Sequence, residues 1–397
     1  MEKLQSKHIK VVSALKTTYT NSLLVKIPWN DRLVGITGAR GVGKTTLILQ
    51  YIALNYQTNT EALYVNLDDI ALSYNSLTTL ADDFVKRGGK HLFLDEIHKF
   101  PNWSKELKTI YDTFFELKVV FTGSSILDIY KGQTDLSRRA LVFNMNGLSF
   151  REFLQIETNQ QFSSYTLPQL LSNHKDIAIS IYQKTKPFQH FSNYLTYGYY
   201  PFYLQNKEFY SMRLSNTLVQ IIENDMPILL NLDVQYINKL KRFVSILAND
   251  IPFKPNISTL AAALGVSWQL IIQYLNYLNK AKIIEIIYPA GKSISTLSKP
   301  EKIYLHHPNL FYVFKDEVQN KGNLRETFFV NQLAYKHKIE IPTRGDFLID
   351  SKYTFEVGGK NKNFHQIADI ADSYIVADDI EFGFENKIPL WLFGFLY

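Results

Sequence analysis

The stretch Gly38-Ala39-Arg40-Gly41-Val42-Gly43-Lys44-Thr45 matches the pattern G-x-x-x-x-G-K-[ST], from which the expected fold follows. It follows the apolar run Leu33–Thr37 and precedes a helical run, which is the strand–loop–helix context that the pattern requires. Glycines let the backbone wrap around an anion, and the following helix presents free N–H groups to it. The stretch predicts a phosphate-binding loop that extends to Thr46, with Lys44 at the β- and γ-phosphates and the Thr45 hydroxyl on Mg²⁺. Arg40 is expected to shape or shield this loop.

Two acids follow a second apolar run. Asp95 and Glu96 come directly after His91–Leu94. An Asp at the tip of a strand suits the holding of Mg²⁺ through its water shell, and the Glu beside it is placed to activate a water as general base. Two solvated acids at a strand end are the alternative, which the intact loop disfavours. The pair therefore extends the expectation from nucleotide binding to hydrolysis.

Short apolar runs alternate with longer helical stretches up to about Asn146. Besides the two runs above, they lie at 62–67, 119–122 and 141–143. This alternation implies βαβ units, so we expect an α/β P-loop NTPase domain with a mainly parallel sheet. Such sheets bind ligands at the carboxyl ends of their strands, so Thr122 or Ser124 is expected to contact the γ-phosphate. An ordinary strand-to-loop turn is the alternative.

The chain resembles the AAA-type ATPases, and more closely a bacterial and archaeal family of AAA-like P-loop ATPases. This resemblance implies ATP rather than GTP, and a C-terminal domain similar to restriction endonucleases. A P-loop kinase is disfavoured, because Glu96 favours water as the nucleophile. The resemblance covers most of the chain and rests on Gly38–Thr46, Leu92–Lys99 with Pro101 and Trp103 after it, Thr122–Ser125, Leu148–Phe153 and Tyr197–Pro201.

Phosphoryl transfer benefits from an added cation, supplied in cis or by a neighbouring subunit. By resemblance, Arg139 falls where the family carries Leu-x-Gly-Arg, although Arg138 replaces the glycine here. Arg139 is therefore the first candidate for a catalytic arginine and Arg151 the second. A helix-capping or core-edge ion pair is the alternative for Arg151. An arginine that acts in trans would require a homo-oligomer.

Residues 236–312 carry the basic excess of the chain, with nine Lys and Arg against three Asp and Glu, in a protein of net charge +6. Three helices at 239–248, 257–264 and 267–280, capped at Ser258 and Ser267, and a hairpin from 283–287 and 302–306 indicate a winged-helix domain. The charge favours DNA as its partner, whereas the third helix, which has no basic residue before its end, favours a protein. Toward DNA the domain offers Gln269, Gln273, Asn276, Lys280, Lys292, Lys299 and Lys302.

The C-terminal segment, a helix followed by strands, one more helix and further strands, has a nuclease-like order of residues. Glu326, Asp346 and Glu356 offer the hard oxygen ligands that Mg²⁺ prefers. In restriction-type enzymes a Lys follows two residues after the Glu, but Gly358 stands there and Lys360 lies further on. A bulge at Gly358 and Gly359 would be needed to bring Lys360 back. We therefore expect a degenerate module without nuclease activity.

Composition bounds the remaining possibilities. The 397 residues include no Cys, which excludes disulfides and thiolate chemistry. No apolar run approaches the ~18 residues that span a bilayer and the N-terminus is polar, so a cytoplasmic protein without membrane contact is expected. The expected parts are an AAA-like ATPase domain at 1–155, a helical region at 156–235, a winged-helix domain at 236–312 and a nuclease-like module at 313–397. Three functions stay open: an ATPase that drives conformational change, a nucleotide-gated nuclease and a non-enzymatic ATP-sensing regulator.

Overall fold

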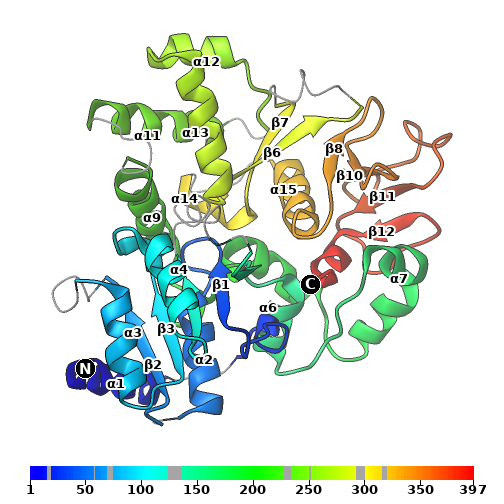
Figure 1. Cartoon of the computed structure of the whole chain (residues 1–397). Helices are drawn as coiled ribbons and strands as arrows, with labels where there is room; N and C mark the ends of the chain where they lie inside the picture. The colour runs from blue at the N-terminus through cyan, green and yellow to red at the C-terminus, as the bar shows by residue number, and fades with distance from the viewer. Residues whose placement is uncertain are drawn as a thin grey trace. The chain divides into compact units, whose positions relative to one another are not determined.

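The computed structural model of the chain describes residues 1–15, 19–57, 59–68, 75–123, 136, 138–227, 234–249, 252–291, 300–314 and 320–397. The chain divides into two compact units, Met1–Gly147 and Leu148–Tyr397 (Figure 1). The finer division into four parts expected from the sequence stays a prediction.

A five-stranded parallel sheet in the order β2-β3-β4-β1-β5 forms the centre of the first unit. The five predicted apolar runs are confirmed as strands. All but the edge strand β5 are buried almost throughout, as continuous apolar runs between two layers of helices should be. The strands are β1 (Leu33–Thr37), β2 (Ala62–Asn66), β3 (His91–Asp95), β4 (Lys118–Thr122) and β5 (Leu141–Asn144).

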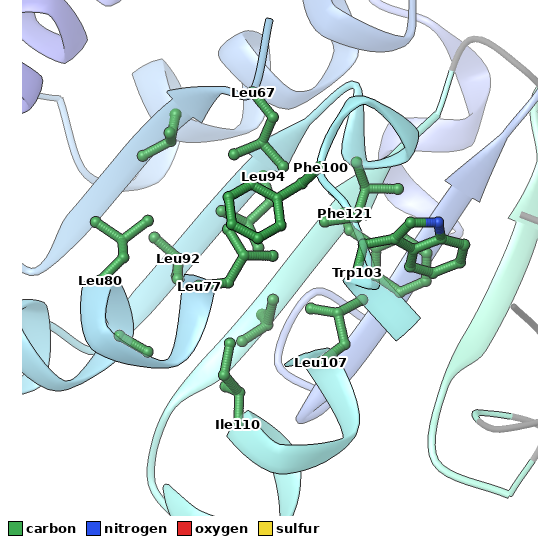
Figure 2. Packing of buried hydrophobic residues seen from close by; sticks show 14 of the residues in the cluster. Leu67, Leu77, Leu80, Leu92, Leu94, Phe100, Trp103, Leu107, Ile110 and Phe121 are labelled. Atoms are coloured by element: carbon green, nitrogen blue, oxygen red, sulfur yellow. The ribbon is translucent and has the colours of Figure 1, made fainter. Parts of the chain in front are cut away.

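Helices cover both faces of this sheet. On one face, α3 and α4 bury leucine and aromatic side chains against alternate residues of β3 and β4, such as Leu92, Leu94 and Phe121 (Figure 2). On the other face, Tyr51 of α2 contacts the ring of Phe93, with 6.0 Å between the ring centroids. The helices are α1 (Glu2–Ser13), η1 (Ser22–Val25), α2 (Lys44–Asn55), α3 (Leu77–Lys86), η2 (Ile97–Lys99) and α4 (Trp103–Thr113).

The second unit contains a mixed seven-stranded sheet in the order β12-β11-β10-β9-β8-β6-β7. The antiparallel pair β6 and β7 confirms the predicted hairpin, and β6 also pairs in parallel with β8, Tyr288 opposite Glu340. One sheet therefore runs across the expected boundary at residues 312 and 313. The strands are β6 (Ile284–Pro289), β7 (Lys302–Leu305), β8 (Ile339–Ile341), β9 (Phe347–Ile349), β10 (Tyr353–Gly358), β11 (Ser373–Ala377) and β12 (Lys387–Pro389).

The helices of this unit begin at polar caps. Ser149 and Glu152 form a capping box at α6, which explains the stretch Leu148–Phe153. The cap expected at Ser258 was wrong: Asn256 accepts from the Thr259 N–H, so the helix begins one residue before Ser258. The first helices are α6 (Phe150–Thr158), α7 (Leu167–Tyr182), α8 (Phe188–Asn193), the π-helix η3 (Tyr194–Gly198), η4 (Pro201–Leu204), α9 (Tyr210–Gln220) and the π-helix η5 (Ile221–Asp225). The remainder are α11 (Val234–Asn249), α12 (Ile257–Leu264), α13 (Trp268–Lys280), η7 (Pro308–Leu310), α14 (Phe311–Phe314), α15 (Lys321–Leu333) and η8 (Leu390–Phe395).

The buried Asn309 completes the end of the π-helix η3. Its Nδ2 donates to the carbonyls of Tyr194 and Leu195 at 2.9 and 2.7 Å, and its Oδ1 accepts from the Tyr199 N–H at 2.9 Å. These bonds satisfy backbone groups that a helix end leaves without partners. The aromatic stretch Tyr197–Pro201 is therefore fixed by a polar side chain more than 100 residues later in the chain.

Two further expectations have direct outcomes. The prediction of a second helix in the C-terminal segment was wrong, because the described residues between β10 and β11 form turns. The lysines and asparagines at 360–363 favour turns over a helix. In the described part of the chain, no single helix has the length and hydrophobicity needed to cross a membrane; α12 and α13 meet the criterion only together, as a pair bent by 103°.

Candidate nucleotide site

The loop after β1 closes around the Lys44 side chain. A Cβ atom on Gly38 would lie 2.2 Å from the Met145 carbonyl oxygen, so only glycine fits there. Gly43 has φ 99° and begins α2 without a side-chain cap, which leaves the first N–H groups of that helix available to an anion. The buried Lys44 ammonium donates to the Gly38 and Ala39 carbonyls at 2.9 and 2.8 Å. The loop therefore holds a cation at the helix N-terminus.

Asp95, at the end of β3, accepts from three hydroxyl groups. Thr45 Oγ1 and the Tyr64 hydroxyl donate to its Oδ2 at 2.7 and 2.8 Å, and Thr122 Oγ1 donates to its Oδ1. The hydroxyls come from α2, β2 and β4, so three elements fix one buried carboxylate. Neutral donors orient Asp95 without cancelling its charge, which stays available to a cation.

Glu96 occupies a sharp turn beside this carboxylate. Its φ of 56° is left-handed, and its N–H donates to Thr122 Oγ1 at 3.2 Å, so Thr122 positions both acids. His98 lies on the short helix that follows, with its Nε2 3.5 Å from Glu96 Oε2. The Glu96 side chain is 18% exposed, so it is partly sheltered from solvent.

Three cations act on the His98 ring. Burial is the main cause that lowers the pKa of His98 to about 4; the nearby charges of Lys99, Lys44 and Arg40 contribute to this lowering, and Asp68 opposes it. His98 is therefore neutral at neutral pH, although three cations lie close to it. A concentration of cations at a helix N-terminus suits the charge of a triphosphate.

The residues present fit Mg²⁺. Thr45 and Asp95 supply one hydroxyl and one carboxylate oxygen within hydrogen-bonding distance of each other, which are the hard ligands that this cation takes. Among the described residues, no group of three or more His, Cys, Asp or Glu is arranged to hold a metal ion. Mg²⁺ in phosphoryl-transfer sites needs no such group, because water and substrate phosphates complete its shell.

Arg139 lies at the opposite end of the sheet from the loop. Parallel pairing places Leu141 opposite Val34 and Asn144 opposite Thr37, so Arg139, two residues before Leu141, lies at the amino ends of the strands. The Arg139 guanidinium donates to both carboxylate oxygens of Asp112 at 3.0 Å. Arg139 therefore does not join the loop of its own chain, and its catalytic role stays a prediction that requires a second copy.

Four other residues were candidates from the sequence. Thr46 is exposed on the first turn of α2, and the Thr122 hydroxyl donates to Asp95. Ser124 lies outside the described residues. Arg151 is buried in the second unit and donates to the Tyr397 carbonyl at 2.8 Å and to Gln155, so its structural alternative holds.

Two of the three acids expected in the nuclease-like module, Glu356 and Glu326, are paired with lysines. Glu356 Oε1 lies 3.2 Å from Lys362 Nζ, so Lys362 takes the place expected for Lys360; β10 ends at Gly358 and the turn after it returns the chain to Glu356. Glu326 accepts from the Tyr304 hydroxyl at 2.7 Å and lies 3.8 Å from Lys302. Asp346 accepts from the Val357 N–H at 2.8 Å.

The basic segment presents a polar helix face. Gln269, Gln273, Asn276 and Lys280 are exposed on α13, as expected. Lys302 lies 3.8 Å from Glu326 and its side chain is 15% exposed, and its contact with phosphates stays a prediction. Lys292 and Lys299 lie outside the described residues.

Two residues of the candidate site were not predicted from the sequence. Tyr64 reaches Asp95 from the neighbouring strand, and its signal was a lone hydroxyl in the apolar run 62–67. His98 belongs to the stretch Leu92–Lys99 on which the family resemblance rests. Only the turn at Glu96 in the structure shows that the His98 ring lies near the Glu96 carboxylate.

Comparisons with known proteins bear on both units. Residues 30–154 match a family model described as an AAA domain, and residues 188–315 match one described as a domain of unknown function. Two uncharacterized proteins of Methanocaldococcus jannaschii are similar to the chain. MJ1637 is 27% identical over 394 residues, covering 90% of this chain and 82% of its own length; MJ1544 is 23% identical over 354 residues, covering 85% and 74%.

Two solved structures align with this chain at low identity. The Walker-type ATPase PABY2304 of Pyrococcus abyssi aligns with 79% of this chain and 95% of its own at 12% identity and a TM-score of 0.38. AMPPCP-bound DnaA from Aquifex aeolicus aligns with 70% of this chain and 89% of its own at 14% identity and a TM-score of 0.26. The parallel sheet and the loop after β1 fit a P-loop NTPase core, in the residues that match the AAA domain model.

Proposed function

We propose that the protein is a Mg²⁺-dependent ATPase whose nucleotide site lies in the first unit. The observation that carries this proposal is the network in which Thr45, Asp95 and Thr122 join the P-loop to Glu96. It supplies in one place a phosphate loop, a carboxylate for a cation and a second carboxylate for a water.

Each residue has a role that its geometry supports. The Lys44 ammonium, now on two loop carbonyls, exchanges these acceptors for phosphate oxygens. Thr45 and Asp95 hold Mg²⁺, which neutralises charge on the phosphates when it is bound. Glu96 accepts the proton of the attacking water as general base. Thr122 holds Asp95 and Glu96 in position relative to each other, and its contact with the γ-phosphate stays a prediction.

The test is phosphate release by wild type and Lys44→Ala under saturating Mg²⁺ and ATP. We expect a loss of about 100-fold or more in the variant, because the charge on the transferred phosphate is left uncompensated. A Lys44→Ala protein that hydrolyses ATP at the wild-type rate contradicts the proposal.

Arg139 is proposed to act on the nucleotide of a neighbouring copy. Its position at the amino ends of the strands supports a role in trans over one in cis. Arg139→Ala and Lys44→Ala should each be inactive alone, and a mixture should regain turnover because some sites then combine an intact loop with an intact arginine. No recovery in a mixed oligomer, or full activity of a monomer, removes Arg139 from the site.

A contact between α13 and double-stranded DNA is the proposed partner interaction. The exposed face of α13 carries Gln269, Gln273 and Asn276, side chains that bond base edges, and the helix contains no acid. ATP turnover with and without single- and double-stranded DNA tests it, and stimulation by the duplex is expected. Unchanged turnover together with no DNA binding would favour a protein partner for the same face.

A nucleotide-gated nuclease is the alternative function for the second unit. The pair of Glu356 and Lys362 is the observation in its favour, since a carboxylate and an ammonium side by side occur in such sites. Mn²⁺-dependent DNA cleavage that is lost in Glu356→Ala would establish it. A non-enzymatic regulator is the third possibility, and it predicts ATP binding with negligible turnover even when DNA is present.

A further inference from the structure

His98 occupies a position that the ATPase roles above leave unexplained. Its side chain is 4% exposed, and Glu96, which it faces, is 18% exposed. A buried imidazole in this location has two possible uses: packing beneath the loop, or orienting the carboxylate. Its distance to one defined oxygen, 3.5 Å from Nε2 to Glu96 Oε2, points to the second use.

The backbone fixes this approach. Glu96 is in the left-handed region, and η2 begins directly after it, with the Lys99 N–H donating to the Glu96 carbonyl at 3.0 Å. Ile97 is fully buried and anchors the turn in the core under β3. The turn therefore returns the His98 ring to the Glu96 side chain, while Thr122 holds the Glu96 N–H from the other side.

The charge state of His98 suits an orienting role. A cation in contact with a carboxylate favours its ionised form and makes it a weaker base. Because burial keeps the His98 ring neutral at neutral pH, an N–H from Nε2 orients Glu96 without that loss of basicity. The 3.5 Å separation is long for a hydrogen bond, and catalytic hydrogen bonds commonly shorten when substrate binds.

We propose that His98 is a positioning residue for ATP hydrolysis, which holds the Glu96 carboxylate toward the attacking water through a neutral Nε2–H. This inference rests on the proposed ATPase function. Its consequence is selective: His98 contributes to the hydrolytic step and not to the binding of ATP, which the loop and Lys44 perform.

Two substitutions at His98 separate positioning from packing. His98→Leu keeps an apolar volume and removes the donor, so kcat should fall about tenfold while KM and ATP affinity change by less than about twofold. His98→Gln places an amide N–H close to the position of Nε2, and should retain about half of the wild-type kcat. His91, buried on β3 and hydrogen-bonded to the Tyr56 hydroxyl at 2.9 Å, is the matched control. His91→Leu should lower the melting temperature without a selective loss of kcat.

A double-mutant cycle completes the test in the full-length protein. In a Glu96→Gln background, adding His98→Leu should lower kcat no further, because the carboxylate that His98 orients is already gone. Undiminished kcat in His98→Leu, an equal loss in His98→Gln and His98→Leu, or full additivity with Glu96→Gln overturns the role of His98 alone. A wild-type protein without ATP turnover, or one insensitive to Glu96→Gln, overturns the ATPase proposal itself and this inference with it.

Discussion

Two acidic clusters, one in each unit, use their charge in opposite ways. In the first unit, Asp95 is held by three neutral hydroxyls, so its negative charge is oriented but not cancelled. In the second unit, Glu356 and Glu326 lie beside the ammonium groups of Lys362 and Lys302, so much of their charge is already balanced within the fold. The type of partner, more than the number of acids, therefore distinguishes a cluster suited to a cation from one that carries its own cation.

The largest expected effect follows from removing the negative charge of Asp95, which its hydroxyl partners do not cancel. Asp95→Asn keeps the size of the side chain and one oxygen acceptor, but it removes the charge that holds Mg²⁺. We expect kcat to fall about 100-fold or more, with a shift of the Mg²⁺ requirement to higher concentration. Glu356→Gln is the control in the other cluster and should leave ATP turnover unchanged. Equal losses in both variants would erase the contrast between the clusters.

The second effect compares a buried arginine of the second unit with a partly exposed arginine of the first unit. Arg151 is buried among the Tyr397 carbonyl, Gln155 and Glu152, so Arg151→Leu leaves buried acceptors unpaired and should cost about 3 kcal/mol of unfolding free energy. Arg139 pairs with Asp112 where both side chains are partly exposed, at 29% and 46%, and Arg139→Leu should cost less than about 1 kcal/mol. Urea denaturation of both variants checks the difference, and similar costs would contradict it.

The third effect depends on pH. Burial opposes ionisation of Glu285, but Lys282 and His306 outweigh it and lower the Glu285 pKa to about 2. Because the folded-state pKa lies below that of the unfolded chain, ionised Glu285 stabilises the fold above about pH 4.5, on the order of 2 kcal/mol, and this is lost as pH falls toward 2. The stability gap between wild type and Glu285→Gln should therefore narrow from pH 6 to pH 3. The exposed Glu385→Gln is the control, and its stability difference from wild type should be constant with pH. A constant difference for Glu285→Gln as well would show that the charge of Glu285 is not responsible.

The smallest effect tests whether Lys362 serves as the cation of its own cluster. Lys362→Met should lower the unfolding free energy by about 1 kcal/mol, because the buried Glu356 carboxylate loses its partner. Mn²⁺ should restore part of this loss in the variant and leave wild type unaffected, as measured by thermal melting with and without the metal. Strong stabilisation of wild type by Mn²⁺ would instead support the nuclease alternative.

The sequence predicted the first unit well because its signals are local. A strand, a glycine loop and a helix follow one another at residues 33–55, and Asp95 ends a continuous apolar run, so neither required knowledge of distant contacts. Contacts across strands were the limit. Nothing in the pattern placed Tyr64 on Asp95, because a run of apolar residues does not name its neighbour in the sheet.

Turns set the other limit. Counting along an extended strand pointed to Lys360, whereas β10 ends at Gly358 and the turn brings Lys362 to Glu356. Similarly, the hairpin of β6 and β7 was expected from its composition, but its pairing with β8 depends on a strand about 50 residues later. Side-chain identity indicated which chemistry was present, and only the path of the backbone assigned the partners.

Phosphate release under single-turnover conditions, with ATP prebound and Mg²⁺ then added, tests the central claim most directly. Wild type should release phosphate only after Mg²⁺ is added, and Glu96→Gln should bind ATP with an affinity within about twofold of wild type yet release phosphate at least about 100-fold more slowly. Mg²⁺-independent release, or release by Glu96→Gln at the wild-type rate, would contradict a hydrolytic site built on Asp95 and Glu96.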